Sequence, residues 1–106
     1  MSQEAIRRTR YLHKTVEVQL TSTQHHVLLA LSDFAVRVLI NGKPGEHFLA
    51  WPSQPTIAKV CFLARSSVKR SLQHLEEVGL IAKDGRVGQM VRYRLHLPPV
   101  PPVEDA

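Results

Sequence analysis

The chain has 106 residues, 43% of them hydrophobic, which argues for one globular domain and against a disordered chain. No apolar run reaches the roughly 18 residues of a membrane span, and the N-terminus lacks the apolar stretch of a secretory signal. The single cysteine, Cys61, excludes an intrachain disulfide, so we expect a soluble, cytoplasmic protein.

The net charge of +5 is concentrated in one part of the chain. Residues 59–94 carry eight lysines and arginines against three acidic residues, whereas the remaining residues carry six of each. A local positive field of this kind suits a polyanion, and nucleic acid fits it better than an acidic lipid surface.

Residues 1–14 are polar and basic, which predicts a short helix or a mobile arm. Three readings of the arginines in this segment stay open: a minor-groove arm, disorder, or a dimerisation helix packed through Ile6, Tyr11 and Leu12. The arginines in question are Arg7, Arg8 and Arg10. Residues 15–20, TVEVQL, alternate apolar and polar side chains and predict a strand. We therefore treat residues 1–19 as a basic N-terminal arm or dimerisation segment.

The clearest helix begins at Thr21, which forms a capping box with Gln24 three residues later. Its predicted apolar face comprises Val27, Leu28, Leu31, Phe34, Ala35 and Val38. The turn-forming sequence NGKPG at residues 41–45 should end it. HFLAW at 47–51 then predicts a short strand, which Pro52 stops.

Two further helices with a tight turn between them follow. Ser53 predicts the N-cap of a helix that runs to about Cys61. The turn at residues 62–64 leads into a helix over residues 65–78, and Gly79 suits its left-handed C-terminal cap. In this last helix the apolar residues fall on one side. Ser66, Arg70 and Gln73 lie on the opposite side, and Ser67, Lys69 and His74 flank them.

A β-hairpin is predicted over residues 80–97, with its tip either at Asp84-Gly85 or at Gly88. Because side chains alternate along a strand, one set should face the core, namely Val91, Tyr93, Leu95 and Leu97. The residues between them should face outward, namely Arg92, Arg94 and His96. The proline-rich residues 98–106 predict a stiff tail beyond a domain at residues 20–97.

The helix at 65–78 has the chemistry of a DNA-reading helix. An α-helix fits the major groove, where arginine and glutamine are suited to bidentate contacts with guanine and adenine. Ser66, Arg70 and Gln73 are therefore the candidates for sequence discrimination. Phosphate contacts are expected from the start of the preceding helix and from the hairpin. The full predicted DNA-binding set is Ser53, Gln54, Thr56, Arg65, Ser66, Ser67, Lys69, Arg70, Gln73, Lys83, Arg86 and Arg92.

Other chemistry finds no support in the residue pattern. The six histidines lack cysteine or acidic partners at ligand spacing, so we expect no metal and no cofactor. Cys61 reads as a small core residue and Trp51 as a core anchor. No nucleophile and base stand together in the sequence, so we expect that the protein is not an enzyme.

Residues 51–81, WPSQPTIAKVCFLARSSVKRSLQHLEEVGLI, resemble the winged helix-turn-helix domains of plasmid replication initiators and phage replisome organisers. LTSTQHHVLLALSDFA before this segment and RYRLHL after it extend the resemblance over residues 20–97. The second half of the segment is shared with many winged-helix transcription regulators. Phe62 departs from the usual glycine of the turn and Ala64 from the usual serine cap. The resemblance implies an α+β winged helix-turn-helix fold, with a three-helix core and a C-terminal hairpin wing.

The function expected on these grounds is sequence-specific binding of double-stranded DNA. The protein would be a small transcriptional regulator, such as a repressor, or a replication-control protein of a plasmid, phage or other mobile element. The short chain has little room for a helicase-recruiting domain, which favours the regulator narrowly. A homodimer on a palindromic site is the default geometry. The alternative is a winged-helix protein-interaction module in a larger assembly, with nonspecific nucleic-acid binding only.

Overall fold

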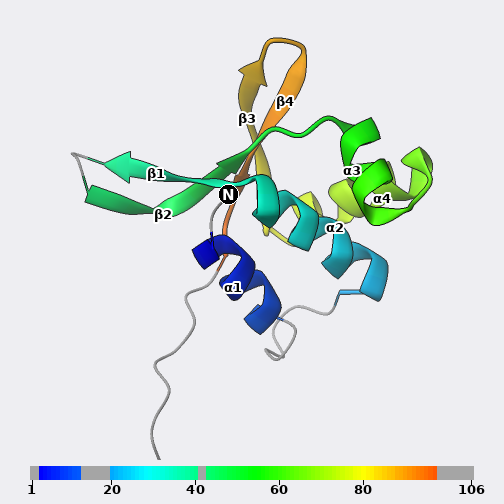
Figure 1. The fold of residues 1–106 in the computed structure, drawn as a ribbon, viewed down its shortest axis with the longest axis horizontal. Helices are drawn as coiled ribbons and strands as arrows, with labels where there is room; N and C mark the ends of the chain where they lie inside the picture. The colour runs from blue at the N-terminus through cyan, green and yellow to red at the C-terminus, as the bar shows by residue number, and fades with distance from the viewer. Residues whose placement is uncertain (1–2, 13–19, 41–42, 98–106) are drawn as a thin grey trace, which may run out of the picture.

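A computed structural model of the protein describes residues 3–12, 20–40 and 43–97. In chain order these residues form α1 (Gln3–Leu12), α2 (Ser22–Phe34), β1 (Val36–Ile40), β2 (Lys43–Ala50), α3 (Gln54–Cys61), α4 (Arg65–Glu77), β3 (Ile81–Val87) and β4 (Met90–Leu95). The strands form one antiparallel sheet in the order β1-β2-β4-β3. Figure 1 shows the helices gathered beside this sheet, with the β3–β4 and β1–β2 hairpins projecting from it. The fold is an α+β winged helix-turn-helix, as predicted.

The start of α2 follows the prediction, but its end does not. The Gln24 N–H donates to Thr21 Oγ1 over 3.2 Å, and the Thr21 N–H donates to Gln24 Oε1 over 3.0 Å, so the capping box is confirmed. The predicted continuation of the helix to Val38 is wrong, because Ala35 is extended and residues 36–40 form β1. This segment, VRVLI, is rich in β-branched residues that favour strands, and β2 supplies a partner for its backbone.

The sequence also predicted strands at residues 47–51 and 15–20. β2 is longer than the predicted strand at 47–51, since it begins at Lys43 and ends at Ala50, one residue before Trp51. The extra residues pair with β1, which was not expected as a strand. The strand predicted at 15–20 lies outside the described residues, except for Leu20, which is not in a strand.

The helix-turn-helix unit is built as predicted. The Thr56 N–H donates to Ser53 Oγ over 3.2 Å and caps α3. The turn of residues 62–64 follows, with Phe62 in the left-handed conformation at φ 55°. Ala64 gives α4 no side-chain cap. At the other end of α4, Gly79 has a φ of 82° and the Leu80 N–H donates to the Leu75 carbonyl over 3.0 Å, so the glycine cap is confirmed.

The hairpin wing has its tip at the second of the two predicted positions. Val87 pairs with Met90, which leaves Gly88 and Gln89 as a two-residue connection. Gly88 has a φ of 61° in the first position of this connection, which suits a type II′ turn. Gly85 lies instead in a register shift of β3 between Lys83 and Arg86, where the strand bulges.

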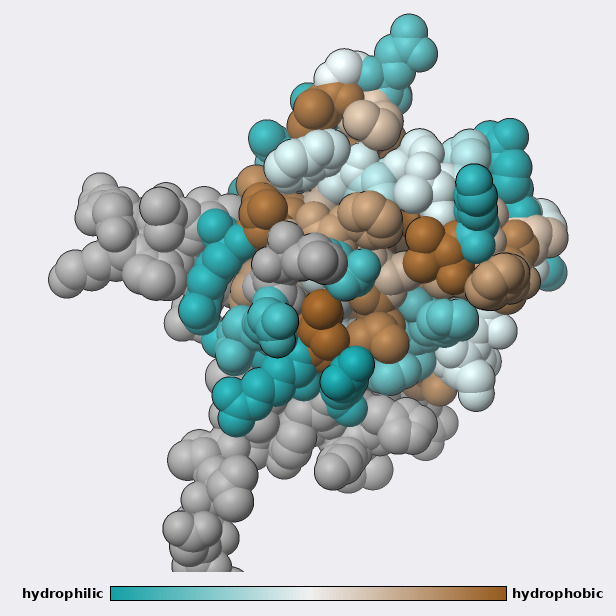
Figure 2. Space-filling view, in the orientation of Figure 1, coloured by the Kyte–Doolittle hydropathy of each residue, from teal (hydrophilic) through white to brown (hydrophobic). Residues whose placement is uncertain are grey.

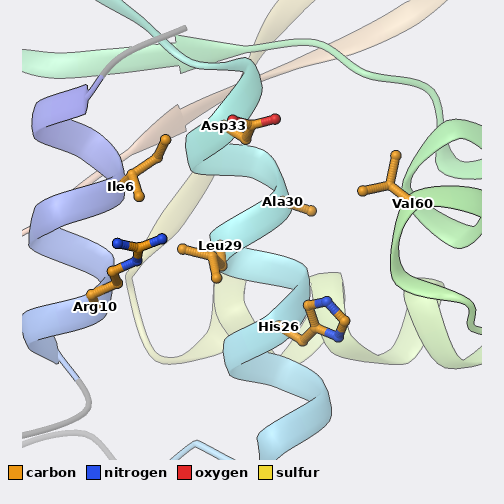
Figure 3. Close-up of a pocket in the computed structure, with 7 residues that line it drawn as sticks. All are labelled: Ile6, Arg10, His26, Leu29, Ala30, Asp33 and Val60. Atoms are coloured by element: carbon orange, nitrogen blue, oxygen red, sulfur yellow. The ribbon is translucent and has the colours of Figure 1, made fainter.

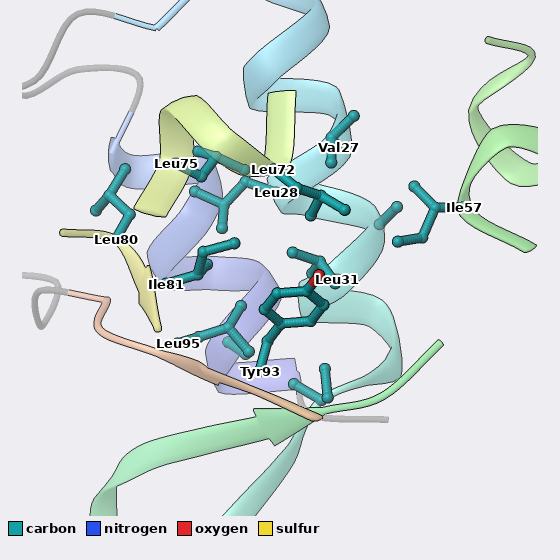
Figure 4. Packing of buried hydrophobic residues seen from close by; sticks show 14 of the residues in the cluster. Val27, Leu28, Leu31, Ile57, Leu72, Leu75, Leu80, Ile81, Tyr93 and Leu95 are labelled. Carbon is teal, nitrogen blue, oxygen red and sulfur yellow. The ribbon is translucent and has the colours of Figure 1, made fainter. Parts of the chain in front are cut away.

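The hydrophobic core lies between α2, α4 and the inner face of the sheet (Figure 4). On α4 the predicted apolar side is confirmed, because Val68 and Leu75 are fully buried and Leu72 is nearly so. They face the buried side chains of α2, chiefly Leu28 and Leu31. Burying one such side chain contributes about 1.5–3 kcal/mol, so this packing anchors α4 firmly to the rest of the fold.

Helix α1 is an integral part of the same fold. Its Thr9 hydroxyl hydrogen-bonds the Ser32 hydroxyl of α2 over 2.5 Å, and both residues are fully buried. Arg8 is also buried, and its guanidinium donates to the Leu97 carbonyl over 3.3 Å while lying 5.3 Å from the centre of the Phe48 ring. Residues 3–12 are thus an ordered helix on α2, and Arg8 is not placed to enter a DNA groove.

Candidate nucleic-acid interface

The outer side of α4 carries polar side chains over its first three turns. The exposed residues there are Arg65, Ser66, Lys69, Arg70 and Gln73, and Ser67 is half-buried. Ser66, Arg70 and Gln73 stand opposite the apolar side that packs on α2. Ser67 and Lys69 flank them, and Arg65 is the first residue of the helix. The geometry is the one that the sequence predicted: the core holds one side of the helix and leaves the other open to a ligand.

The cations on this side of α4 have no ion-pair partner among the described residues. Arg65, Lys69 and Arg70 form no ion pair with any described residue. The helix also presents the positive end of its dipole here, and the N–H groups of its first turn have no side-chain cap. The acidic Glu76 and Glu77 stand at the opposite end of the helix. At this end of α4, both the backbone N–H groups and the cationic side chains therefore attract anions.

The predicted contacts at the start of α3 are partly engaged within the protein. The Ser53 and Thr56 hydroxyls hydrogen-bond each other over 2.8 Å, and Ser53 Oγ also accepts the capping N–H of Thr56. The Gln54 side chain lies in the same hollow as the Tyr93 phenol of β4. Ser53 and Thr56 therefore order the start of α3, and their remaining capacity for phosphate is smaller than their side-chain types suggest.

A hollow of about 450 Å³ brings three predicted parts of the interface together. Its lining comes from the start of α3, including Gln54, from Arg65 at the start of α4, and from Gln89, Met90 and Tyr93 of the wing. Burial raises the pKa of the Tyr93 phenol, and the negative charge of Glu76 raises it further. The phenol is therefore a neutral wall of the hollow at physiological pH.

The wing does not present all of its cations to solvent. Arg94 Nη2 and Nε donate to Asp84 Oδ2 over 2.7 and 3.0 Å. Arg92 Nε donates to the Asp84 carbonyl over 2.6 Å, and its Nη2 lies 3.5 Å from Asp84 Oδ1. The hydrogen bond from Arg94, together with the charges of both guanidinium groups, lowers the pKa of the Asp84 carboxyl. One carboxylate thus binds two arginines that the sequence predicted to face outward.

The two remaining wing cations are more available. Arg86 is exposed and forms no ion pair within the described part of the chain. Lys83 is also exposed, and among the described residues it forms a single, long ion pair, of 4.0 Å, with Glu76. Among the predicted wing contacts the structure therefore favours Arg86 and Lys83 over Arg92.

Two residues that shape this surface were missed by sequence reasoning. Asp84 was considered only as a turn residue, although an acidic residue on one strand of a hairpin can reach arginines on the neighbouring strand, as Asp84 of β3 reaches Arg92 and Arg94 of β4. Tyr93 was assigned to the core and is buried there, but nothing in the sequence signalled that it also lines a hollow with Gln54. In the described ranges no three histidine, cysteine or acidic residues gather as metal ligands. No described helix is long and apolar enough to cross a membrane.

An anchored helix with a free basic side, preceded by a capped helix and followed by a hairpin, defines a winged helix-turn-helix DNA-binding domain. Comparison with known families agrees with this class. The helix-turn-helix domain family matches residues 19–81, more than half of the chain, and the protein belongs to this family. No curated protein and no solved structure matches the chain significantly.

Proposed function

We propose that this protein binds double-stranded DNA in a sequence-specific manner, with α4 in the major groove. Ser66, Arg70 and Gln73 would contact base edges, since their side chains are exposed on the outer side of the helix. Arg65 and Lys69 flank them and would neutralise phosphates, as would Arg86 and Lys83 of the wing.

A single observation carries this proposal: the outer side of α4 has three exposed cations without ion-pair partners among the described residues. A solvated surface usually intersperses charges of both signs, and the wing of this protein shows such pairing at Asp84. A protein surface that leaves its positive charges uncompensated on a rigid helix is suited to a polyanionic ligand.

The test has two stages. Random oligonucleotides are first selected on the purified protein, and the enriched site is then compared with a scrambled duplex in a binding titration. We expect the site to bind about 10³-fold more tightly or better, with log affinity falling linearly with log salt concentration. Equal affinity for both duplexes would instead favour an interaction module with nonspecific nucleic-acid binding.

The biological role that we propose is transcriptional regulation in a plasmid, phage or other mobile element, in the cytoplasm. A compact DNA reader can repress a promoter by occupying it, without a second activity. Replication control is the other role considered. Mapping the selected site decides between them: a promoter-overlapping site supports regulation, and repeated sites within a replication origin support replication control.

A further inference from the structure

A second surface of the molecule, built by α1, α2 and α3, is apolar and hollowed. A hollow of about 220 Å³ lies along α2, with α1 on one side and α3 on the other (Figure 3). Ile6, Leu29, Ala30 and Val60 supply its apolar lining. On this face Figure 2 shows brown side chains between teal ones, running from α1 across α2 toward α3. We name this surface the α2 groove.

The α2 groove lies on the side of α2 away from Leu28 and Leu31. The α2 residues that line it are His26, Leu29, Ala30 and Asp33. Those two leucines pack toward α4 and the sheet, so the body of the domain separates the groove from the recognition side. A ligand in the groove would leave the side chains of Arg70 and Gln73 uncovered.

Phe62 is a further exposed apolar residue, in the turn that follows α3. Its side chain is 93% exposed, and Val60 two residues earlier is 46% exposed. Phe62 also has a φ of 55°, a left-handed conformation that costs roughly 1–2 kcal/mol for a residue with a side chain. Glycine would avoid both this strain and the exposed ring. The fold of one chain therefore gives no reason for phenylalanine at this position.

The groove carries one cation and one anion on different helices. Arg10 lines it from α1 and Asp33 from α2, and neither forms an ion pair with a described residue. A two-fold dimer joins the same patch on both copies, so a patch with one free charge of each sign can satisfy itself twice. The outer side of α4, with cations only, would repel a second copy.

From these features we infer that a second copy of this chain covers the α2 groove and Phe62, and that Arg10 of each copy pairs with Asp33 of the other. The apolar residues supply the contact area, and the two ion pairs set the orientation. The surface is small for a stable dimer, for which about 800 Å² per partner is usual. Association should therefore depend on concentration. This inference goes beyond the proposed function and stands whether or not the protein prefers one DNA sequence.

Sedimentation equilibrium of the full chain tests the inference without DNA. Over about 1–300 µM, a range suited to a small interface, the mass should rise from one chain to two. Arg10→Asp and Asp33→Arg should each weaken dimerisation about tenfold or more, because each reversal places like charges together at both symmetric pairs. Combining the two substitutions should return the dissociation constant to within about threefold of the original value.

Two further variants separate this interface from nonspecific effects. Arg7→Asp makes the same charge change on an exposed residue of α1 outside the groove lining, and it should leave dimerisation nearly unchanged. Phe62→Gly should weaken dimerisation about tenfold, as expected for an aromatic anchor. Its melting temperature should not fall, because glycine accepts the positive φ.

A chain that stays monomeric over the whole concentration range would overturn the inference. So would a dimer that ignores Phe62→Gly, or one that the combined charge swap fails to restore. If Phe62→Gly lowered DNA affinity while the dimer persisted, Phe62 would belong to the DNA surface and the assignment would be wrong. A protein that dimerises as described but binds no DNA would refute only the proposed function.

Discussion

The basic side of α4 and the outer side of the wing both carry arginine and lysine, but they differ in whether acidic residues pair with these cations. On α4, Arg65, Lys69 and Arg70 project without ion-pair partners among the described residues. On the wing, Arg92 and Arg94 share the carboxylate of Asp84. Counting charges along the sequence therefore overstates the positive surface of the hairpin. A cation contributes to phosphate binding only if no acid of the same fold engages it first.

The largest effect is expected from loosening the anchor of α4. Leu75 is fully buried between α4 and α2, so Leu75→Ala should lower the free energy of unfolding by about 2–5 kcal/mol. Urea unfolding followed by circular dichroism measures this. Gln73→Ala on the exposed side of the same helix is the control and should stay within about 0.5 kcal/mol. Similar losses in both variants would mean that the two sides of α4 are not distinct.

DNA affinity should separate α4 from the wing next. Arg70→Ala should cost about 1–3 kcal/mol on the selected site and reduce the preference for that site, whereas Arg86→Ala should weaken all duplexes about evenly. Arg94→Ala removes the same charge from a side chain that Asp84 already engages, so its effect should be the smallest of the three. Fluorescence anisotropy on selected and scrambled duplexes measures all three. Equal losses for Arg70→Ala and Arg94→Ala would contradict the contrast between the two regions.

The two helix N-termini of the unit offer a smaller test. Ser53 caps α3 with its side chain, but Ala64 cannot cap α4. Ala64→Ser should therefore raise the free energy of unfolding by about 1 kcal/mol. Ser53→Ala, the matched opposite change, should lower it by a similar amount. If Ala64→Ser also weakened DNA binding, the uncapped N–H groups of α4 would be implicated in contacting phosphate.

The smallest effect concerns pH and the wing. The pairing with Arg94 and Arg92 lowers the pKa of Asp84, so the folded state holds this carboxylate charged to lower pH than the unfolded state does. The pairing contributes its full stability above the unfolded pKa and loses it as pH falls through the folded pKa. Carboxyl NMR should show Asp84 titrating below the usual aspartate range, and Asp84→Asn should remove this part of the acid sensitivity. An Asp84 titration in the usual range would show that the carboxylate is not engaged in solution.

Prediction from the sequence worked best where a few neighbouring residues decide the structure. The capping box at Thr21, the Ser53 cap and the glycine cap after α4 each depend on a side chain and a backbone group a few residues apart. The apolar side of α4 could be predicted equally well, because helical spacing alone places its leucines on one side. The helix-turn-helix unit and its exposed polar side followed from these local signals.

The predictions failed where apolar residues fitted both a helical and a strand period, or where the interacting residues lay on different elements. Phe34, Ala35 and Val38 fit a continuing helix, whereas Val36, Val38 and Ile40 alternate as in a strand, and pairing with β2 selects the strand. The charge on Arg92 was visible, but its engagement depends on which residue of β3 the hairpin register places beside it. The division of the chain at residues 19 and 97 stays a prediction.

The sequence by itself determined the order of the helix-turn-helix unit, its caps and the polar side of α4, because each rests on interactions within one or two helical turns. Tertiary structure decided the end of α2, the burial of Arg8, the hollow that Gln54 and Tyr93 share, and the ion pairs of the wing arginines. Each of these joins residues that are remote in the chain or on different strands. Their contact energy depends on a geometry that exists only once the elements have packed.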